Sequence, residues 1–221
     1  MSAAARHSAR TGEHGTPPDV VELVRTVLGG VIELDPASSA EFNKTVRAER
    51  FFTADDNGLE QELEAKTAMI NPPGSCPTTV KRTRNRATWK RHGCDRSAVR
   101  QRPADKTSER WDGGSPPPCL CKLVPRFWLH VLDAWGRRRV KSVVWIGYSL
   151  DQLQTLQGCE GLWFTQRALT PLSFPMCVPS RRLQFNGSSP THANYITLLP
   201  GHPRQEVLFR EIFAELGEVR L

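Results

Sequence analysis

The alternation of apolar and polar positions in the first third of the chain predicts a helix followed by two strands. Residues 19–28 carry apolar side chains at helical spacing, which predicts an amphipathic helix. Residues 31–34 and 67–70 are short apolar runs, a pattern typical of buried strands. Each predicted strand leads into a loop that contains proline: Asp35-Pro36-Ala37-Ser38 after the first, and Asn71-Pro72-Pro73-Gly74 after the second.

The remaining apolar pattern predicts helices and strands in alternation. A short helix at 40–46 and a short strand at 51–53 lie between the two loops. The elements predicted downstream are a helix at 126–135, a strand at 140–146, a helix at 150–156, strands at 162–164 and 176–178, a hairpin of 182–185 with 194–199, and a helix at 205–216. This order predicts an α/β fold, a Rossmann-like sheet with helices on both faces and an antiparallel hairpin near the C-terminus.

One basic segment interrupts the pattern. Residues 76–124 have few apolar side chains, and such a composition cannot bury enough surface to offset the entropy of ordering. The sequence therefore predicts a loosely ordered insertion within a single domain of residues 16–221, preceded by a flexible tail of residues 1–15. Residues 78–110 hold eleven Lys and Arg against three Asp and Glu, whereas the rest of the chain holds nineteen against twenty. This charge attracts polyanions, although a solvated loop without a partner has the same composition.

The overall composition indicates a globular protein of the cytoplasm. Hydrophobic residues make up 38% of the chain and charged residues 24%. No apolar run reaches the length of a membrane span, so we expect no membrane partner. The N-terminal residues lack the apolar core of a secretory signal, which favours reduced thiols for the six cysteines. The spacing of the cysteines fits no common structural zinc site, and we expect no metal.

The loop Asn71-Pro72-Pro73 has the groups needed to hold an exocyclic amine for methylation. The lone pair of such an amine is delocalised into the ring, so a site needs hydrogen-bond acceptors that favour a more tetrahedral nitrogen. The side-chain amide of Asn71 and the carbonyl of Pro72 are two such acceptors, and prolines keep this backbone extended. Ligands of open α/β sheets bind at the carboxyl ends of strands, where this loop lies. The same residues also form ordinary turns.

With its neighbouring motifs, the loop resembles the phage-type DNA adenine methyltransferase family (Dam-like). The resemblance covers about three quarters of the chain, in the order and close to the spacing of the family. The matching elements are Thr16-Pro17-Pro18, Leu34-Asp35-Pro36-Ala37-Ser38, Asn43, Arg50-Phe51-Phe52-Thr53, Asp56-Asn57-Gly58-Leu59, Asn71-Pro72-Pro73, Pro125-Arg126-Phe127-Trp128, the strand at 140–146, Arg182-Leu183-Gln184-Phe185 and Ser189-Pro190-Thr191-His192-Ala193-Asn194.

The resemblance implies a Rossmann-like methyltransferase fold that uses S-adenosyl-L-methionine to methylate adenine in double-stranded DNA, in a bacterial or phage-infected cell. It implies that Asn71 and Pro72 hold the target amine and that Pro73 shapes the loop. It also implies a cofactor site: Asp35, Pro36, Ala37 and Ser38 as its floor, Thr16 and Pro17 at the methionine end, and Asp56 and Asn57 at the adenosine end. Without the resemblance, Asp35 is equally a helix cap, and Asp56-Asn57 a plain turn.

The chain departs from the family at two places. The family usually has an aromatic residue after the two prolines, where it stacks on the extruded base, and this chain has Gly74. Trp111, Phe127 and Trp128 are candidate replacements. The second departure is the basic insertion, whose position directly after the loop makes its cations candidate DNA contacts. These cations are Lys81, Arg82, Arg84, Arg86, Lys90 and Arg91.

Two other functions fit the same residues. A nucleic-acid-binding protein without catalytic activity, built on a degenerate methyltransferase fold, fits Gly74 and the basic insertion. A methyltransferase that acts on RNA or on a protein glutamine fits Asn71-Pro72-Pro73, because this chemistry serves any planar amine or amide.

Overall fold

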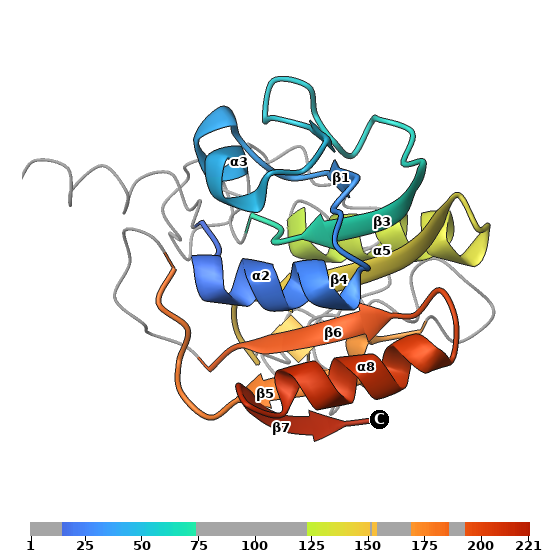
Figure 1. Cartoon of the computed structure of the whole chain (residues 1–221). Helices are drawn as coiled ribbons and strands as arrows, with labels where there is room; N and C mark the ends of the chain where they lie inside the picture. Colours follow the sequence, from blue (N-terminus) through green and yellow to red (C-terminus); the bar gives the residue numbers. More distant parts are fainter. Residues whose placement is uncertain (1–14, 74–122, 151, 154–168, 186–192) are drawn as a thin grey trace, which may run out of the picture.

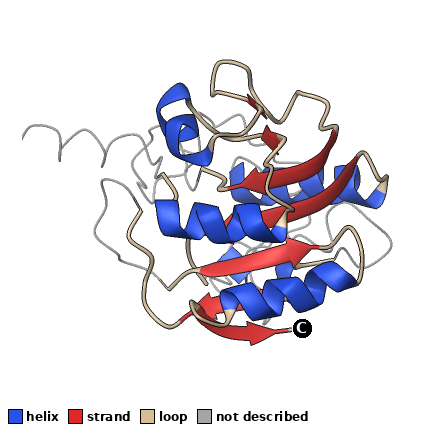
Figure 2. Ribbon diagram, in the orientation of Figure 1, coloured by secondary structure: helices blue, strands red, loops and turns tan. Residues whose placement is uncertain are grey.

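The computed structural model describes residues 15–73, 123–150, 152–153, 169–185 and 193–221. These residues form one mixed sheet of seven strands, in the order β2-β1-β3-β4-β6-β5-β7 (Figures 1 and 2). The strands are β1 (Leu34–Asp35), β2 (Arg50–Phe51), β3 (Ala65–Ile70), β4 (Val140–Gly147), β5 (Met176–Pro179), β6 (Tyr195–Leu199) and β7 (Gly217–Arg220). The predicted α/β class is confirmed.

The first four strands run parallel and the last three continue the sheet with antiparallel pairs. β3 lies between β1 and β4 and is parallel to both, so the chain before the basic insertion pairs directly with the chain after it. β6 is antiparallel to β4, and β5 is antiparallel to both β6 and β7. Antiparallel pairing near the C-terminus is confirmed, but it does not involve residues 182–185.

Helices cover both faces of the sheet, and each face has its own hydrophobic core. On one face α2 (Pro18–Val27) and α8 (Arg204–Phe213) bury Val24, Phe209 and Phe213 against the sheet. On the other face α5 (Leu123–Gly136) buries Trp128, whose ring meets that of Trp145 edge-on, with 5.1 Å between the centroids.

Local signals set the helix boundaries on the α2 side of the sheet. Pro18 stands at the first position of α2, where its fixed φ fits and its missing N–H costs nothing. α3 (Ala40–Val46) begins where the Ser39 hydroxyl accepts a hydrogen bond from the backbone N–H of Phe42, at 3.2 Å. It ends at Arg47, which adopts a left-handed conformation. These helices match the predicted ranges closely.

Two predictions near the C-terminus are wrong. Residues 182–185 are no strand, because the backbone N–H of Leu183 is bonded to the side chain of Asn194 and not to a neighbouring strand. The arm that pairs with β6 is β5, through Met176 with Thr197 and Cys177 with Ile196. The last helix ends at Phe213, and the chain then forms the unpredicted edge strand β7.

Several other predictions lie outside the described residues. These are residues 1–14 of the tail, the strand at 162–164, and all but the last two residues of the basic insertion at 76–124. Of the short helix predicted at 150–156, three residues are described: Leu150 lies in a turn, and residues 152–153 are helical. Within the described ranges, no helix combines the length and the apolar content that a membrane span requires.

Candidate functional site

The residues predicted to form the site meet at one edge of the sheet. β1, β3 and β4 are parallel, so their carboxyl ends share this edge, on the left in Figure 1. Asp35 closes β1, Asn71 follows β3 and Tyr148 follows β4. α2 precedes β1 and runs back along the sheet, which brings its first residues and Thr16 to the same edge. The carboxyl edge of a parallel sheet is where α/β proteins bind ligands.

Asn71 is in direct contact with the start of α2. Its side-chain nitrogen donates a hydrogen bond to the Thr16 hydroxyl, with 3.2 Å between Nδ2 and Oγ1. Thr16 and Pro72 are buried, and Asn71 is half-buried. Two segments far apart in sequence, one predicted for the target amine and one for the cofactor, are therefore adjacent.

Asp35 carries a carboxyl group that is almost fully removed from water. The residue is 3% exposed, and its Oδ1 accepts a hydrogen bond from the backbone N–H of Ala37 at 3.1 Å. Burial raises the pKa of Asp35 from its ordinary value of 3.8 to about 6, although the Ala37 N–H and the nearby Ser38 hydroxyl act in the opposite direction. The Ser38 hydroxyl is itself buried and falls short of hydrogen-bond geometry with any partner among the described residues. Both polar groups would gain from a ligand that offers them a hydrogen bond.

The loop with Asp56 and Asn57 packs against the Asp35–Ser38 segment. The backbone of Phe52 bonds to both ends of that segment, donating to the carbonyl of Asp35 and accepting from the N–H of Ser38. Gly58 lies so close that a Cβ there would be 2.0 Å from the carbonyl oxygen of Pro36. The loop after β2 is therefore held beside the predicted cofactor segment.

Asp56 itself stabilises a turn. Its carboxylate accepts hydrogen bonds from the N–H and the hydroxyl of Thr53, at 2.8 and 2.7 Å, and these bonds lower the pKa of Asp56. Asn57 has a φ of 52°, which suits a turn residue. Asp56 and Asn57 therefore form a turn, next to the segment that they were predicted to assist.

Two of the candidate aromatic replacements for Gly74 are part of the hydrophobic core. Phe127 and Trp128 are buried in the core under α5, and the indole N–H of Trp128 is bonded to the carbonyl of Leu169 at 2.9 Å. Trp111 lies outside the described residues, as do the six cations predicted to contact DNA: Lys81, Arg82, Arg84, Arg86, Lys90 and Arg91.

Tyr148 is the aromatic residue that follows β4 at this edge, and the sequence analysis did not select it. β3 pairs with β4 up to Ile70 and Trp145, so Tyr148 follows β4 at the edge where Asn71 follows β3. Tyr148 is half-buried on the α2 side of the sheet, with its ring centroid 5.8 Å from that of Phe185. The sequence feature that could have identified Tyr148 is its place, as an aromatic residue, directly after the most apolar strand.

Asn194 fixes the backbone around Tyr148. It is 3% exposed, and its side chain donates to the Tyr148 carbonyl at 2.6 Å and accepts from the Leu183 N–H at 2.9 Å. The backbone N–H of Leu150 also bonds to the carbonyl of Ala193 at 2.9 Å. The segment after β4 is therefore tied to the start of β6 and to the segment after β5.

Comparison with known proteins gives no relative: no family model matches the chain, and no curated protein or solved structure shows significant similarity. The part of the chain that the structure describes holds no group of three or more His, Cys, Asp or Glu side chains placed to bind a metal ion. The function is therefore inferred from the carboxyl edge of the sheet and its side chains.

Proposed function

We propose that this chain transfers a methyl group from S-adenosyl-L-methionine to the exocyclic amine of adenine in DNA. The observation that carries the proposal is the meeting of Asn71-Pro72-Pro73, Asp35–Ser38 and Thr16 at the carboxyl edge of one α/β sheet. A loop suited to a planar amine and a segment suited to a cationic ligand are adjacent there, as a two-substrate transfer requires. The resemblance to the phage-type DNA adenine methyltransferase family supplies the identity of both substrates.

The residues at the end of β1 fit the methionine part of the cofactor. The buried carboxylate of Asp35 would accept a hydrogen bond from the ammonium group, and this cation would offset the cost of burying the negative charge. The Ser38 hydroxyl offers a further donor and acceptor. When bound, the cofactor supplies a methyl group already activated by its sulfonium.

Asn71 and Pro72 would hold the acceptor amine in line with that methyl group. The contact of the Asn71 amide nitrogen with Thr16 fixes the plane of the amide. The amide oxygen of Asn71 and the carbonyl of Pro72 would each accept one hydrogen of the amine, which favours a nucleophilic nitrogen. Most of the acceleration would come from this alignment.

Tyr148 would supply the aromatic surface that Gly74 does not. It follows β4, the strand that pairs with β3, and its backbone is held by Asn194. Base–aromatic stacking contributes about 1–3 kcal/mol per base. We therefore expect Tyr148→Ala to lower kcat/KM for DNA roughly 5- to 150-fold, whereas Tyr148→Phe stays near the wild-type value. Steady-state kinetics on an adenine-containing duplex measures this.

The control for Tyr148→Ala is the affinity for S-adenosyl-L-methionine, which a role confined to the base leaves unchanged. Circular dichroism melting identifies any loss of packing against Phe185. An alanine variant that keeps the wild-type kcat/KM would rule out stacking by Tyr148.

A substrate panel with methyl-labelled cofactor tests the proposed function. Purified full-length chain is incubated with duplex DNA, the same duplex with adenine replaced by its N6-methyl form, an RNA hairpin and a glutamine-containing peptide. We expect label in the first substrate only. Label in RNA or in the peptide would instead assign the chain to the other acceptor classes that Asn71-Pro72-Pro73 can serve.

A non-catalytic nucleic-acid binder is the second candidate, because Gly74 lacks the aromatic ring and the insertion is strongly basic. Calorimetry separates the two functions. Heat of binding with S-adenosyl-L-methionine is expected for the enzyme, and its absence in folded protein would favour the binder.

A further inference from the structure

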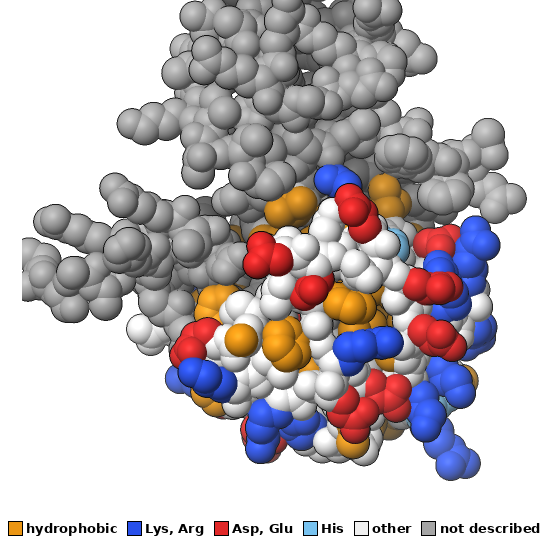
Figure 3. Space-filling view, turned by 90° about the horizontal axis from the view of Figure 1, so that it is seen from above, with side chains coloured by type: hydrophobic (Ala, Val, Ile, Leu, Met, Phe, Trp, Pro, Cys, Tyr) orange, Lys and Arg blue, Asp and Glu red, His pale blue; other side chains and the backbone are white. Residues whose placement is uncertain are grey.

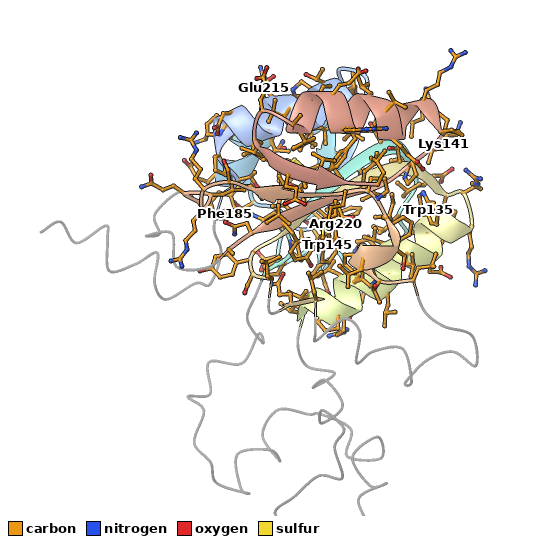
Figure 4. The ribbon with its side chains drawn as sticks, turned by 90° about the horizontal axis from the view of Figure 1, so that it is seen from below. Trp135, Lys141, Trp145, Phe185, Glu215 and Arg220 are labelled. Atoms are coloured by element: carbon orange, nitrogen blue, oxygen red, sulfur yellow. The ribbon has the colours of Figure 1, made fainter. Side chains whose placement is uncertain are left out.

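Two consecutive arginines lie at the same edge of the sheet as Asn71. β4 and β5 are both antiparallel to β6, so β5 runs in the direction of β4 and ends at the same edge. Arg181 and Arg182 follow that end, and both are exposed. Phe185 follows the two arginines by a few residues. In Figure 4 it lies at the opposite end of the molecule from Lys141.

The backbone that carries the two arginines is fixed on both sides. Before them, the N–H and the hydroxyl of Ser180 donate to the Leu216 carbonyl at 3.0 and 3.2 Å. After them, Leu183 is buried, and its N–H donates to the side chain of Asn194. The guanidinium groups therefore project from a segment whose position is set before any ligand binds, which lowers the entropic cost of binding.

The charge of this pair is only weakly compensated. Arg181 and Asp19 are 4.0 Å apart, with 79% and 63% of their side chains exposed, so that contact is weak. Arg182 has no carboxylate within ion-pair distance among the residues that the structure describes. At the opposite end of the sheet, Arg139 contacts both Asp133 and Glu62, at 2.7 and 3.2 Å. Figure 3 shows cationic and anionic side chains next to each other at that end, on the right.

We propose that Arg181 and Arg182 bind phosphates of the DNA strand beside the extruded base. This inference rests on the proposed function, since it takes duplex DNA as the substrate. The order β3-β4-β6-β5 separates the ends of β3 and β5 by three strand spacings, about 14 Å at about 4.8 Å each. A phosphate flanking the target base thus reaches the pair while the base reaches Asn71.

Salt-dependent DNA binding tests the pair. The anisotropy of a fluorescein-labelled, adenine-containing duplex is measured with full-length protein over a range of salt concentrations, without cofactor. Each phosphate contact contributes about −0.9 to the slope of log K against log salt concentration. We expect Arg181→Gln with Arg182→Gln to make this slope shallower by about two units, and Arg181→Lys with Arg182→Lys to keep it.

A matched control removes two cations from the other end of the sheet. Arg138 and Lys141 are exposed, and Lys141 lies about 20 Å from Gly147 along β4, at about 3.3 Å per residue. Arg138→Gln with Lys141→Gln changes the net charge equally and is expected to leave the slope at the wild-type value. Equal slopes for the two Gln variants would contradict the inference, as would a wild-type chain that binds an RNA hairpin but no duplex DNA.

The test of the arginine pair can fail independently of the test of the proposed function, because DNA binding is measured without methyl transfer. A chain that binds duplex DNA through the pair but labels no substrate would contradict the proposed function alone. A chain that methylates DNA while the Gln variant keeps the wild-type slope would contradict this inference alone.

Discussion

Asn71→Ala is expected to lower kcat for DNA methylation roughly 100- to 1,000-fold, the loss seen when one preoriented hydrogen-bonding group is removed from an active site. The variant loses the amide oxygen that would accept a hydrogen from the target amine, and it loses the contact with Thr16. Asp35 and Ser38 are untouched, so the affinity for S-adenosyl-L-methionine is expected to stay close to that of the wild type. Single-turnover methylation and calorimetry measure the two quantities separately.

Thr16→Val is the matched control for that variant. Valine has nearly the shape of threonine but removes the hydroxyl that holds the Asn71 amide. We expect a smaller loss of kcat, because the amide oxygen is still present but is less firmly oriented. Asn71→Ala with wild-type kcat would show that the site assignment is wrong. Loss of cofactor binding in Asn71→Ala would place this residue in the cofactor site instead.

The spacing of apolar residues predicted most of the helices and strands, because an element that is buried on one face has apolar residues at regular intervals. α3 and β4 match their predicted ranges within one residue. The alternation of apolar residues also led to a wrong strand prediction at residues 182–185. Leu183 and Phe185 are buried there in alternation, as they would be in a strand. Periodicity reports which side chains are buried and not where the backbone N–H groups bond. The bond from Leu183 to the side chain of Asn194 is therefore invisible in the pattern.

β7 was missed for a related reason. Its four residues alternate between half-buried and exposed positions at the edge of the sheet, and only a short turn separates them from α8. So short an edge strand is defined by its partner β5, through pairs such as Cys177 with Val219, and not by its own composition.

Some residues of the candidate site were predictable from the sequence, and others were not. Asn71 was selected from its place after an apolar run, and Asp35 and Thr16 were selected from the resemblance. Tyr148 and Asn194 required the sheet order, because only the pairing of β3 with β4 and of β4 with β6 brings them to the edge beside Asn71. Residues whose role depends on neighbours far along the chain leave no local pattern.

Asp35→Asn is expected to stabilise the protein without its cofactor while weakening cofactor binding. Because burial raises the pKa of Asp35 from 3.8 to about 6, the native state holds more protons than the unfolded state between these two pH values. The free energy of unfolding therefore falls as pH rises through this window, and the penalty is fully present above about pH 6. Asparagine is neutral and can still accept from Ala37, so the variant is expected to gain up to about 3 kcal/mol at pH 8. Urea unfolding at pH 5 and pH 8 measures this gain.

The same carboxylate predicts how the binding of S-adenosyl-L-methionine depends on pH. The ammonium group of the cofactor needs the ionised form of Asp35, so the affinity of the wild type should rise with pH up to about 6 and then level off. Asp35→Asn should bind weakly at every pH, with no such rise. Asp56→Asn is the matched control: its carboxylate is exposed and its pKa is lowered by Thr53, so it should lose some turn stability and keep the wild-type binding profile. A wild-type affinity that stays constant between pH 5 and pH 8, or an Asp35→Asn variant that binds the cofactor as well as the wild type, would remove Asp35 from the cofactor site and leave its buried carboxyl a structural feature of the β1 turn.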